Sequence, residues 1–346
     1  MPALKDDGAA EAKKSQKVLL TGGTGFIASH VLDVLLDHGY TVVVTARSEE
    51  KGKRIIDAIP PDLRDRVSYV VVADIAQPGA FDQAVVSDPP FDFVIHTASP
   101  YQLQFNDPIA DCLDPAIKGT TGILQSIHAF APTVKRVVIT SSSAAILDPP
   151  NHPKVYDESI WSSVTLDQAT DPAHTYRASK KFAELSAWNF LTTTTPPPSF
   201  TLATINNTYT FGPLPRSLAS LSSGTINTSN LRILDLVRGQ HRAAIPPTAP
   251  VFTFVDVRDV ALAHVRAMEV PEAGGKRFYV VLGGVLPSEE VVAGTVDDFP
   301  EGHWRFDNSR SRGVLGVEYR GLEESVVDTV RSILGMDVEG GEGKGM

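Results

Sequence analysis

The 346-residue sequence has little cysteine and a shortage of positive charge. Its single cysteine, Cys112, excludes a disulfide within the chain and a cysteine-rich metal site, so we expect no metal centre. We interpret Cys112 as a small buried apolar residue rather than a nucleophile. The formal net charge is −10 at pH 7. Nucleic acids and anionic membranes are therefore disfavoured as main partners, because phosphate groups attract clustered Lys and Arg.

Long apolar runs are also lacking. No run reaches the roughly 20 residues that a membrane-spanning helix needs. The first sixteen residues carry charges throughout and have no apolar core of the kind that a secretory signal requires. We therefore expect a cytoplasmic protein that is not bound to membranes. Polar and Gly-rich composition predicts disorder over 1–16 and 337–346.

Between these ends, short β-rich runs alternate with helical patterns. The strand segments are apolar runs rather than strict alternations, which is typical of a parallel sheet buried on both faces. Regular β–α alternation predicts an α/β fold with a doubly wound parallel Rossmann sheet. The expected strands are 18–21, 41–45, 67–72, 91–97, 136–140, 201–206 and 277–282. The expected helices are 26–38, 49–58, 79–86, 109–131, 174–191, 230–238, 256–269, 287–298 and 321–335.

A glycine-rich turn joins the first strand to the first helix. It fits either Gly23-x-Gly25-x-x-Ala28 or Gly22-x-x-Gly25-x-x-Ala28. Glycine permits a tight turn and lets backbone N–H groups approach a pyrophosphate at the helix N-terminus. A strand before the turn and an amphipathic helix after it are the context that dinucleotide binding requires. The residues expected to hold the cofactor here are Gly22, Gly23, Thr24, Gly25, Phe26 and Ile27.

The end of the second strand indicates which nucleotide binds. An NAD site usually has an acidic residue here for the ribose 2′-hydroxyl. This sequence has Arg47 instead, with Lys51 four residues later. A guanidinium can bind a 2′-phosphate in bidentate fashion. We therefore predict NADPH as the cofactor, with Arg47 and Lys51 at its 2′-phosphate. Glu49 and Glu50 can offset part of this charge, which leaves use of NADH open as well.

Further cofactor candidates follow the later strands. Asp74 has two interpretations: its carboxylate accepts from the adenine amino group, or it caps its own loop. The segment His96-Thr-Ala-Ser-Pro100 is expected to border the diphosphate and ribose. We interpret His96 as a buried, hydrogen-bonded histidine rather than an acid–base catalyst. The candidates from these strand ends are Asp74, Ile75, Thr97, Ala98, Ser99, Thr140 and Asn206.

Two segments carry the predicted chemistry. Tyr176 and Lys180 are four apart in a helical pattern and so share one helix face. An ammonium beside a phenol favours the phenolate, and it can also hold ribose hydroxyls of the cofactor. Thr140-Ser-Ser-Ser143 ends the fifth strand, at the sheet edge where α/β proteins bind ligands. A serine hydroxyl there completes a pair of donors around a carbonyl oxygen. Lys181 points about 100° away and is the weaker candidate.

Together these residues resemble the extended short-chain dehydrogenases/reductases. Within them, the sequence is similar to the dihydroflavonol-4-reductase-like branch, including methylglyoxal/isovaleraldehyde reductases and related ketoreductases. The resemblance implies that Ser142 is catalytic with Tyr176 and Lys180, and that Ser143 is the fallback. It also implies substrate binding between the Rossmann domain and a smaller lobe. The matching segments are Thr21–Ala28, Arg47–Lys51, His96–Pro100, Thr140–Ser142, Tyr176–Lys180, Phe211-Gly-Pro213 and Val255–Ala261.

One residue departs from that pattern. The family usually has Asn-Pro shortly before Phe-Gly-Pro, whereas this sequence has Asn206-Asn207. Loss of the proline removes a rigid backbone position near the nicotinamide.

We expect residues 17–206, rejoined by 254–283, to form the NADP-binding domain. A change to Ser, Thr, Pro and Gly after residue 206 indicates a substrate lobe from 207–253 and 284–336. The predicted substrate contacts are Pro100, Tyr101, Leu147 and Thr208. Their surroundings are mostly apolar and lack clustered Lys or Arg. This favours an apolar ketone or aldehyde, including a polyketide-like natural product, over a phosphorylated substrate.

Three functions compete at this stage. The favoured one is an NADPH-dependent carbonyl reductase, with hydride transfer to the carbonyl carbon and proton transfer from Tyr176. A nucleotide-sugar epimerase or dehydratase on the same fold would prefer NAD and an acidic residue near position 47. A non-enzymatic NADP(H)-sensing protein would not need both Tyr176 and Lys180. Fold alone does not separate these functions.

Overall fold

The computed structural model describes residues 16–99, 106–149, 151–215, 226–240, 253–283 and 304–335. Seven strands form the central sheet in the order β10-β7-β5-β4-β1-β2-β3, and every neighbouring pair is parallel. The order reverses between β1 and β4, as in doubly wound folds. This confirms the predicted fold class. The strands are β1 (Lys17–Thr21), β2 (Thr41–Ala46), β3 (Val67–Val71), β4 (Phe93–His96), β5 (Arg136–Thr140), β7 (Thr201–Asn207) and β10 (Lys276–Val280).

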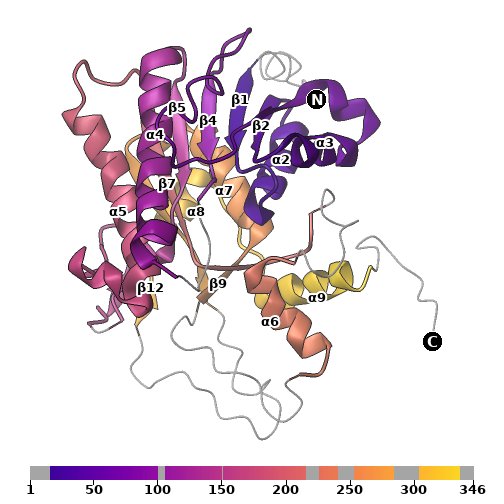
Figure 1. Ribbon diagram of the computed structural model, residues 1–346. Helices are drawn as coiled ribbons and strands as arrows, with labels where there is room; N and C mark the ends of the chain where they lie inside the picture. The colour runs from indigo at the N-terminus through magenta and orange to yellow at the C-terminus, as the bar shows by residue number, and fades with distance from the viewer. Residues whose placement is uncertain are drawn as a thin grey trace, which may run out of the picture.

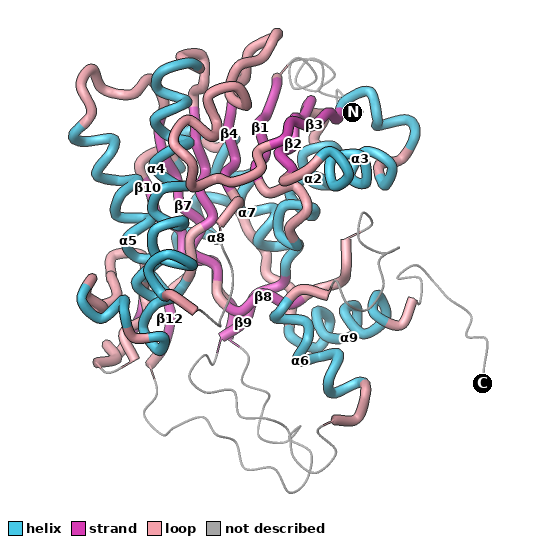
Figure 2. The backbone as a smooth tube through the Cα atoms, in the orientation of Figure 1, coloured by secondary structure: helices cyan, strands magenta, loops and turns pink. Residues whose placement is uncertain are grey.

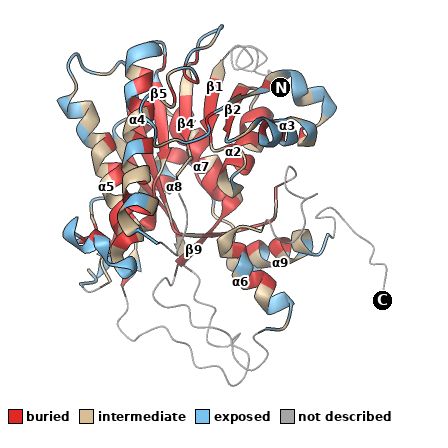
Figure 3. Cartoon of the chain, in the orientation of Figure 1, coloured by how far each residue is buried: buried red, intermediate tan, exposed pale blue. Residues whose placement is uncertain are grey.

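Helices cover both faces of this sheet (Figure 1). Successive strand residues point to opposite faces, so Val18 and Leu20 belong to one buried cluster and Leu19 to another. Figure 3 shows that the buried residues concentrate in the sheet and on the helix faces against it. One face packs against α2 (Phe26–Asp37), α3 (Glu49–Ala58) and α7 (Val257–Glu269), and the other against α4 (Asp114–Phe130) and α5 (Pro172–Thr193).

A smaller set of elements lies beyond the carboxyl ends of the strands (Figure 2). β8 (Tyr209–Phe211), β9 (Thr253–Asp256) and β11 (Leu282–Gly283) form a three-stranded sheet. β6 (Val155–Tyr156) pairs with β12 (Arg305–Phe306). Helices α6 (Thr228–Val237) and α9 (Leu322–Ile333) pack against each other. Of these elements, β8, α6, β12 and α9 lie in the ranges predicted for the second lobe, whereas β6 and β11 lie in those predicted for the NADP-binding domain.

Helix α8 (Ser309–Leu315) lies elsewhere. It packs against α7 and β10, and its residue Leu315 belongs to the main core. Part of the 284–336 segment that was predicted to form the lobe therefore belongs to the Rossmann half. The division into two domains otherwise stays a prediction.

The predicted helix over 79–86 is wrong. The segment is a series of turns, with Ala80 N–H donating to Gln77 O at 3.1 Å and Asp82 N–H to Gly79 O at 3.0 Å. Gly79 has φ +70°, a left-handed conformation that cannot continue a helix. The helical spacing still predicts which side chains of this segment are buried, because Phe81, Ala84 and Val85 all pack in the core.

Other differences are smaller. The predicted 109–131 helix begins with a π-helical turn, Ile109–Leu113, before α4. The predicted 277–282 strand ends at Val280, and Leu282–Gly283 belongs to the three-stranded sheet with β8 and β9. The predicted 287–298 helix and nearly all of the predicted disordered ends lie outside the described residues. Within the described ranges, none of the helices combines the length and apolarity that crossing a bilayer requires.

Candidate functional site

The glycine turn after β1 is tightly packed against the end of β4. Gly22 has φ +75°, and a Cβ there would lie 2.9 Å from Thr97 Oγ1. Its N–H donates to Thr45 Oγ1 at 3.0 Å, and Gly25 N–H donates to Gly22 O at 2.8 Å. Gly25 is the N-cap of α2; no side chain caps it, and the first turn contains no acidic residue. The helix N-terminus therefore presents backbone N–H groups suited to a phosphate.

Thr21 connects this turn to the segment after β4. Its hydroxyl oxygen accepts the N–H groups of Thr97 and Ala98, each at 3.1 Å. It lies 2.8 Å from His96 Nδ1, so its hydrogen is donated to that nitrogen. Burial lowers the pKa of His96 to about 3. His96 is thus a neutral, hydrogen-bonded residue, as the sequence analysis favoured, and it is unsuited to acid–base catalysis near neutral pH.

Arg47 is exposed at the end of β2. The two acidic residues that could offset its charge have other partners: Glu49 accepts from the Tyr69 hydroxyl at 2.7 Å, and Glu50 pairs with Arg54 at 2.6 Å. In the described part of the chain, no carboxylate lies within ion-pair distance of Arg47 or of Lys51. Both cations therefore remain available to an added phosphate.

Asp74 follows β3 and caps its own loop. Its carboxylate accepts from Gln77 Nε2 at 2.7 Å and from Ala76 N–H at 2.9 Å, and these bonds lower its pKa. Ile75 packs against Gly119 at the side of α4. A cavity of about 280 Å³ opens beside the Asp74 loop and the start of α4. The capping interpretation is therefore correct, and contact with adenine stays a prediction.

The face of α5 carrying Tyr176 and Lys180 lies against the segment after β4. Lys180 is 8% exposed, and its Nζ donates to Ser99 Oγ at 2.8 Å. The same Nζ lies 5.6 Å from the centroid of the Tyr176 ring. Burial lowers the pKa of Lys180 to about 8. Lys181 points elsewhere and donates to Val164 O at 2.7 Å. The structure thus brings Tyr176, Lys180 and Ser99 together.

The serines after β5 have different surroundings. Ser142 is the N-cap of the short helix η3 (Ser143–Ala145), and its Oγ accepts from Ala144 N–H at 3.1 Å. Among the described residues its hydroxyl hydrogen has no acceptor, so it can be donated to a ligand. Ser141 Oγ instead donates to the buried Glu184 carboxylate at 2.6 Å. Because η3 packs against α5, Ser142 lies on the side of the Tyr176 helix.

Four predicted ligand contacts have side chains that are bonded to or packed against other residues of the protein, and all but the half-buried Thr140 are buried. Asn206 is fully buried and donates to Glu184 at 2.7 Å. Thr208 is bonded to the hydroxyl of Thr253 at 2.7 Å. Thr140 is bonded to His264 Nε2 at 2.7 Å, and Leu147 packs in an aromatic cluster. These side chains contact other groups of the protein, and their assignment as ligand contacts stays a prediction. Pro100 and Tyr101 lie outside the described residues.

Glu184 was not among the site residues predicted from the sequence. It follows Lys180 by four residues on α5, so Tyr176, Lys180 and Glu184 repeat at i, i+4 and i+8. That spacing was the signal in the sequence from which Glu184 could have been placed on the same helix face as the catalytic pair. Only the fold shows that the carboxylate lies under the end of β5.

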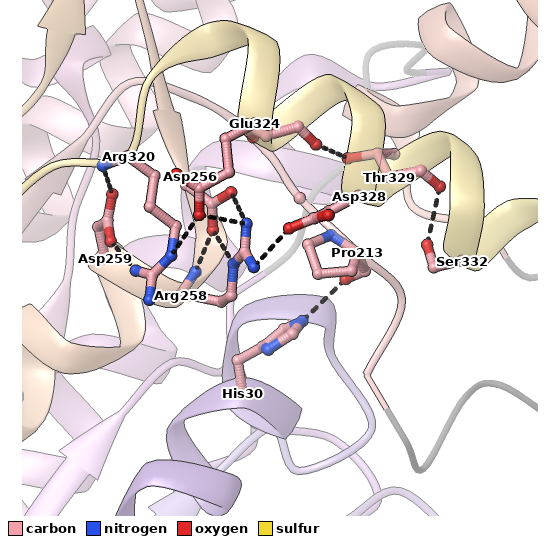
Figure 4. Close-up of polar contacts among 12 residues, drawn as sticks. His30, Pro213, Asp256, Arg258, Asp259, Arg320, Glu324, Asp328, Thr329 and Ser332 are labelled. Atoms are coloured by element: carbon pink, nitrogen blue, oxygen red, sulfur yellow. Dashed lines mark hydrogen bonds and ion pairs between the residues drawn. The ribbon is translucent and has the colours of Figure 1, made fainter. Parts of the chain in front are cut away.

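A second polar cluster connects the smaller lobe to the Rossmann half (Figure 4). Arg258 of α7 bonds to Asp256 Oδ2 at 2.9 Å and to Asp328 Oδ2 of α9 at 2.8 Å. Nearby, Arg320 pairs with Asp259. This cluster fixes α9 against the start of α7.

The loop that begins at Asn207, where the family usually has a proline, is held by hydrogen bonds. Asn207 Nδ2 donates to Thr210 Oγ1 at 3.0 Å. Pro213 O lies 2.9 Å from His30 Nε2 of α2, and Figure 4 shows this contact. Burial lowers the pKa of His30 to about 4. The neutral ring therefore donates its Nε2–H to the loop, which is held by side-chain hydrogen bonds where the family usually has a proline.

Comparisons with known proteins agree with this arrangement. The ketoreductase azaE of Aspergillus niger is 50% identical, over 92% of this chain and 98% of its own length. The NADPH-dependent methylglyoxal reductase GRE2 of Saccharomyces cerevisiae is 33% identical, over 92% and 98%. The crystal structure of Gre2 in complex with NADPH from Candida albicans superposes with a TM-score of 0.81 at 32% identity, covering 92% of this chain and 99% of that one.

A family model described as the NAD dependent epimerase/dehydratase family matches residues 18–283, which include the glycine turn, the serines after β5 and the Tyr176 helix. This range is most of the chain. The chain therefore belongs to the NAD-dependent epimerase/dehydratase family, the extended short-chain dehydrogenases/reductases.

Proposed function

We propose that this protein is an NADPH-dependent carbonyl reductase. The observation that carries the proposal is the position of buried Lys180, bonded to Ser99 after β4 and close to the Tyr176 ring. We assign the free hydroxyl hydrogen of Ser142, at the start of η3 on the α5 side, to the same place at the carboxyl edge of the sheet. A carbonyl oxygen bound there would receive a proton and a hydrogen bond.

The described residues fit NADPH. The compact Gly22 turn and the open N-terminus of α2 suit a diphosphate. Arg47 and Lys51 suit the 2′-phosphate, because both are exposed and neither is in an ion pair within the described ranges. We assign the remaining cofactor contacts to Thr97, Ala98 and the Lys180 ammonium.

The roles follow from this geometry. NADPH, when bound, supplies the hydride for the carbonyl carbon. The Tyr176 hydroxyl gives its proton to the carbonyl oxygen, and the Lys180 ammonium stabilises the phenolate that remains. Ser142 donates a hydrogen bond to the same oxygen as negative charge develops on it. His96 and Cys112 take no part, since burial keeps the imidazole neutral and raises the pKa of the thiol.

The substrate class is a ketone or aldehyde of apolar character. Two relatives are named a ketoreductase and a methylglyoxal reductase, which supports small carbonyl compounds as substrates. The 50% identity to a protein named a ketoreductase favours a ketone over an aldehyde.

The test is oxidation of NADPH, with NADH in parallel. The panel contains methylglyoxal, an aliphatic aldehyde, ethyl acetoacetate and an aromatic polyketide-like ketone. We expect turnover with NADPH well above NADH, and the highest kcat/KM on a ketone. Tight NADPH binding without turnover of any member would contradict the reductase assignment and favour an NADP(H)-sensing protein.

A further inference from the structure

The buried carboxylate of Glu184 lies where four elements meet. Glu184 is 2% exposed and projects from α5. Its Oε2 accepts from Ser141 Oγ at 2.6 Å and Asn206 Nδ2 at 2.7 Å. Its Oε1 accepts from Thr204 Oγ1 at 2.9 Å and Arg277 Nε at 2.7 Å. These partners follow or belong to β5, β7 and β10, so one side chain connects α5 to three strands of the sheet.

Arg277 supplies the countercharge and is itself fixed. Its Nη1 donates to Glu158 O at 2.7 Å and Ile160 O at 2.8 Å. The guanidinium carbon lies 3.6 Å from the centroid of the Trp161 ring. A buried carboxylate that is paired and fully hydrogen-bonded has one well-defined position. Glu184 is therefore a rigid reference point rather than a mobile charge.

Two of these contacts reach the serine predicted to act in catalysis. Ser141 is the neighbour of Ser142 in the chain and is bonded directly to Glu184. Asn206 Nδ2 donates to Glu184 and also to the backbone oxygen of Ser142 at 3.3 Å. Glu184 thus holds the Ser142 backbone from two directions.

The same residue fixes the other half of the site. Tyr176, Lys180 and Glu184 lie on one face of α5, at successive turns of about 5.4 Å. A shift of Glu184 along the helix axis would move Tyr176 and Lys180 relative to Ser142. Among the described residues, the hydrogen bonds of the Glu184 carboxylate involve neither Tyr176 nor Lys180, so its influence passes through the helix.

We propose that Glu184 is a positioning residue that sets the distance between Ser142 on the sheet and the Tyr176–Lys180 face of α5. This inference rests on the proposed reductase function, because it assumes that these three side chains act together on one carbonyl. Such a residue contributes to the rate through geometry, since a misplacement of the order of 1 Å can reduce a rate by about 100-fold.

The test compares Glu184→Gln with wild type in the NADPH oxidation assay, on the panel compound with the highest kcat/KM. We expect kcat to fall by about 10- to 100-fold while KM changes little, since alignment is needed in the transition state. NADPH affinity, measured by quenching of tryptophan fluorescence, should remain within about twofold of wild type if the cofactor contacts are intact.

The matched control is Glu269→Gln. Glu269 is another mostly buried carboxylate, bonded to His38 Nδ1 at 2.9 Å and to the Tyr40 hydroxyl at 3.1 Å. It lies at the amino ends of the strands, beside the start of β2, so it is remote from the catalytic edge. We expect Glu269→Gln to lower the melting temperature and leave kcat of the folded protein unchanged.

A second variant covers the case in which Glu184→Gln does not fold. Ser141→Ala removes one hydroxyl and leaves the Glu184–Arg277 pair intact, and we expect kcat to fall by about three- to tenfold. A folded Glu184→Gln, or failing that a folded Ser141→Ala, with wild-type kcat would overturn the positioning role while the reductase function stands. A wild type that turns over no carbonyl compound rejects both.

Discussion

Two buried ionic clusters differ in what they connect. The cluster around Glu184 connects α5 to strands of the sheet on which that helix packs. The cluster around Arg258 connects two helices, the start of α7 and α9 (Figure 4). Glu184 is almost fully buried, whereas the Arg258 side chain is 24% exposed and its partner Glu324 is 55% exposed.

The difference indicates two uses of buried charge. A carboxylate enclosed within the sheet and helix fixes side chains a few ångströms apart, and this precision matters to the reaction rate. An arginine at a junction holds whole elements together, and this matters first to stability. We therefore expect changes on the α5 side to reduce the rate, and changes at the Arg258 junction to reduce the free energy of unfolding.

The largest expected effect is at Tyr176. Tyr176→Phe removes the proposed proton donor, and kcat should fall by about 100- to 10,000-fold, the range for general acid catalysis. NADPH affinity and the melting temperature should stay near wild type, measured by fluorescence titration and thermal unfolding. Full turnover by this variant would show that Tyr176 is not the proton donor. Changes on the α5 side could then not be said to act mainly on the rate.

The junction is tested by Arg258→Met. The variant leaves Asp256, which has no exposed surface, without its cation, and leaves the mostly buried Asp328 with only the longer contact to Arg331 at 3.6 Å. Removing one partner of a buried ion pair costs about 3–5 kcal/mol, so the free energy of urea unfolding should fall by about 3 kcal/mol. At low temperature kcat should change far less than in Tyr176→Phe. A large loss of kcat in a folded Arg258→Met would erase the proposed distinction.

A change at the cofactor end should affect affinity alone. Arg47→Ala removes an exposed, unpaired guanidinium and should weaken NADPH binding by about 10- to 100-fold, as expected for charge-assisted hydrogen bonds. NADH binding, kcat at saturation and the unfolding energy should remain close to wild type. Equal weakening for both nucleotides would mean that Arg47 does not contact the 2′-phosphate.

The effect expected to be smallest near neutral pH is a pH dependence set by Lys180. Burial lowers the pKa of Lys180 to about 8, so the ammonium is lost as pH rises through that value. Reduction requires the charged form, and kcat/KM should fall by about tenfold per pH unit above pH 8. Lys180→Arg keeps the charge, so its lower rate should show no such fall. A wild-type rate that is flat to pH 10 would contradict this role.

The fold class and the position of the cofactor turn were predictable because both depend on local patterns. Apolar runs alternating with helical spacing specify a parallel sheet with helices on its faces, and glycines at a strand–helix turn specify a backbone geometry. Tyr176 and Lys180 were placed on one face by helical spacing alone. Each of these inferences uses residues less than a helix length apart.

Long-range contacts decided the rest. Three adjacent serines look alike in sequence, and only the tertiary contacts with Glu184 and Asn206 show that the Ser141 hydroxyl is already bonded within the protein. The 79–86 pattern is helical in spacing, but its apolar side chains enter the core from a series of turns. The Arg258–Asp328 contact joins residues 70 apart.

The sequence by itself therefore determined the sheet, the cofactor turn and the pair on α5, because short-range spacing dictates which side chains share a face. Only the tertiary structure decided that the Ser141 hydroxyl is bonded within the protein, which polar residues are enclosed, and that Glu184 connects the helix to the sheet. These contacts join side chains that are far apart in the sequence and meet only when helices cover both faces of the sheet. A local sequence pattern therefore does not predict them.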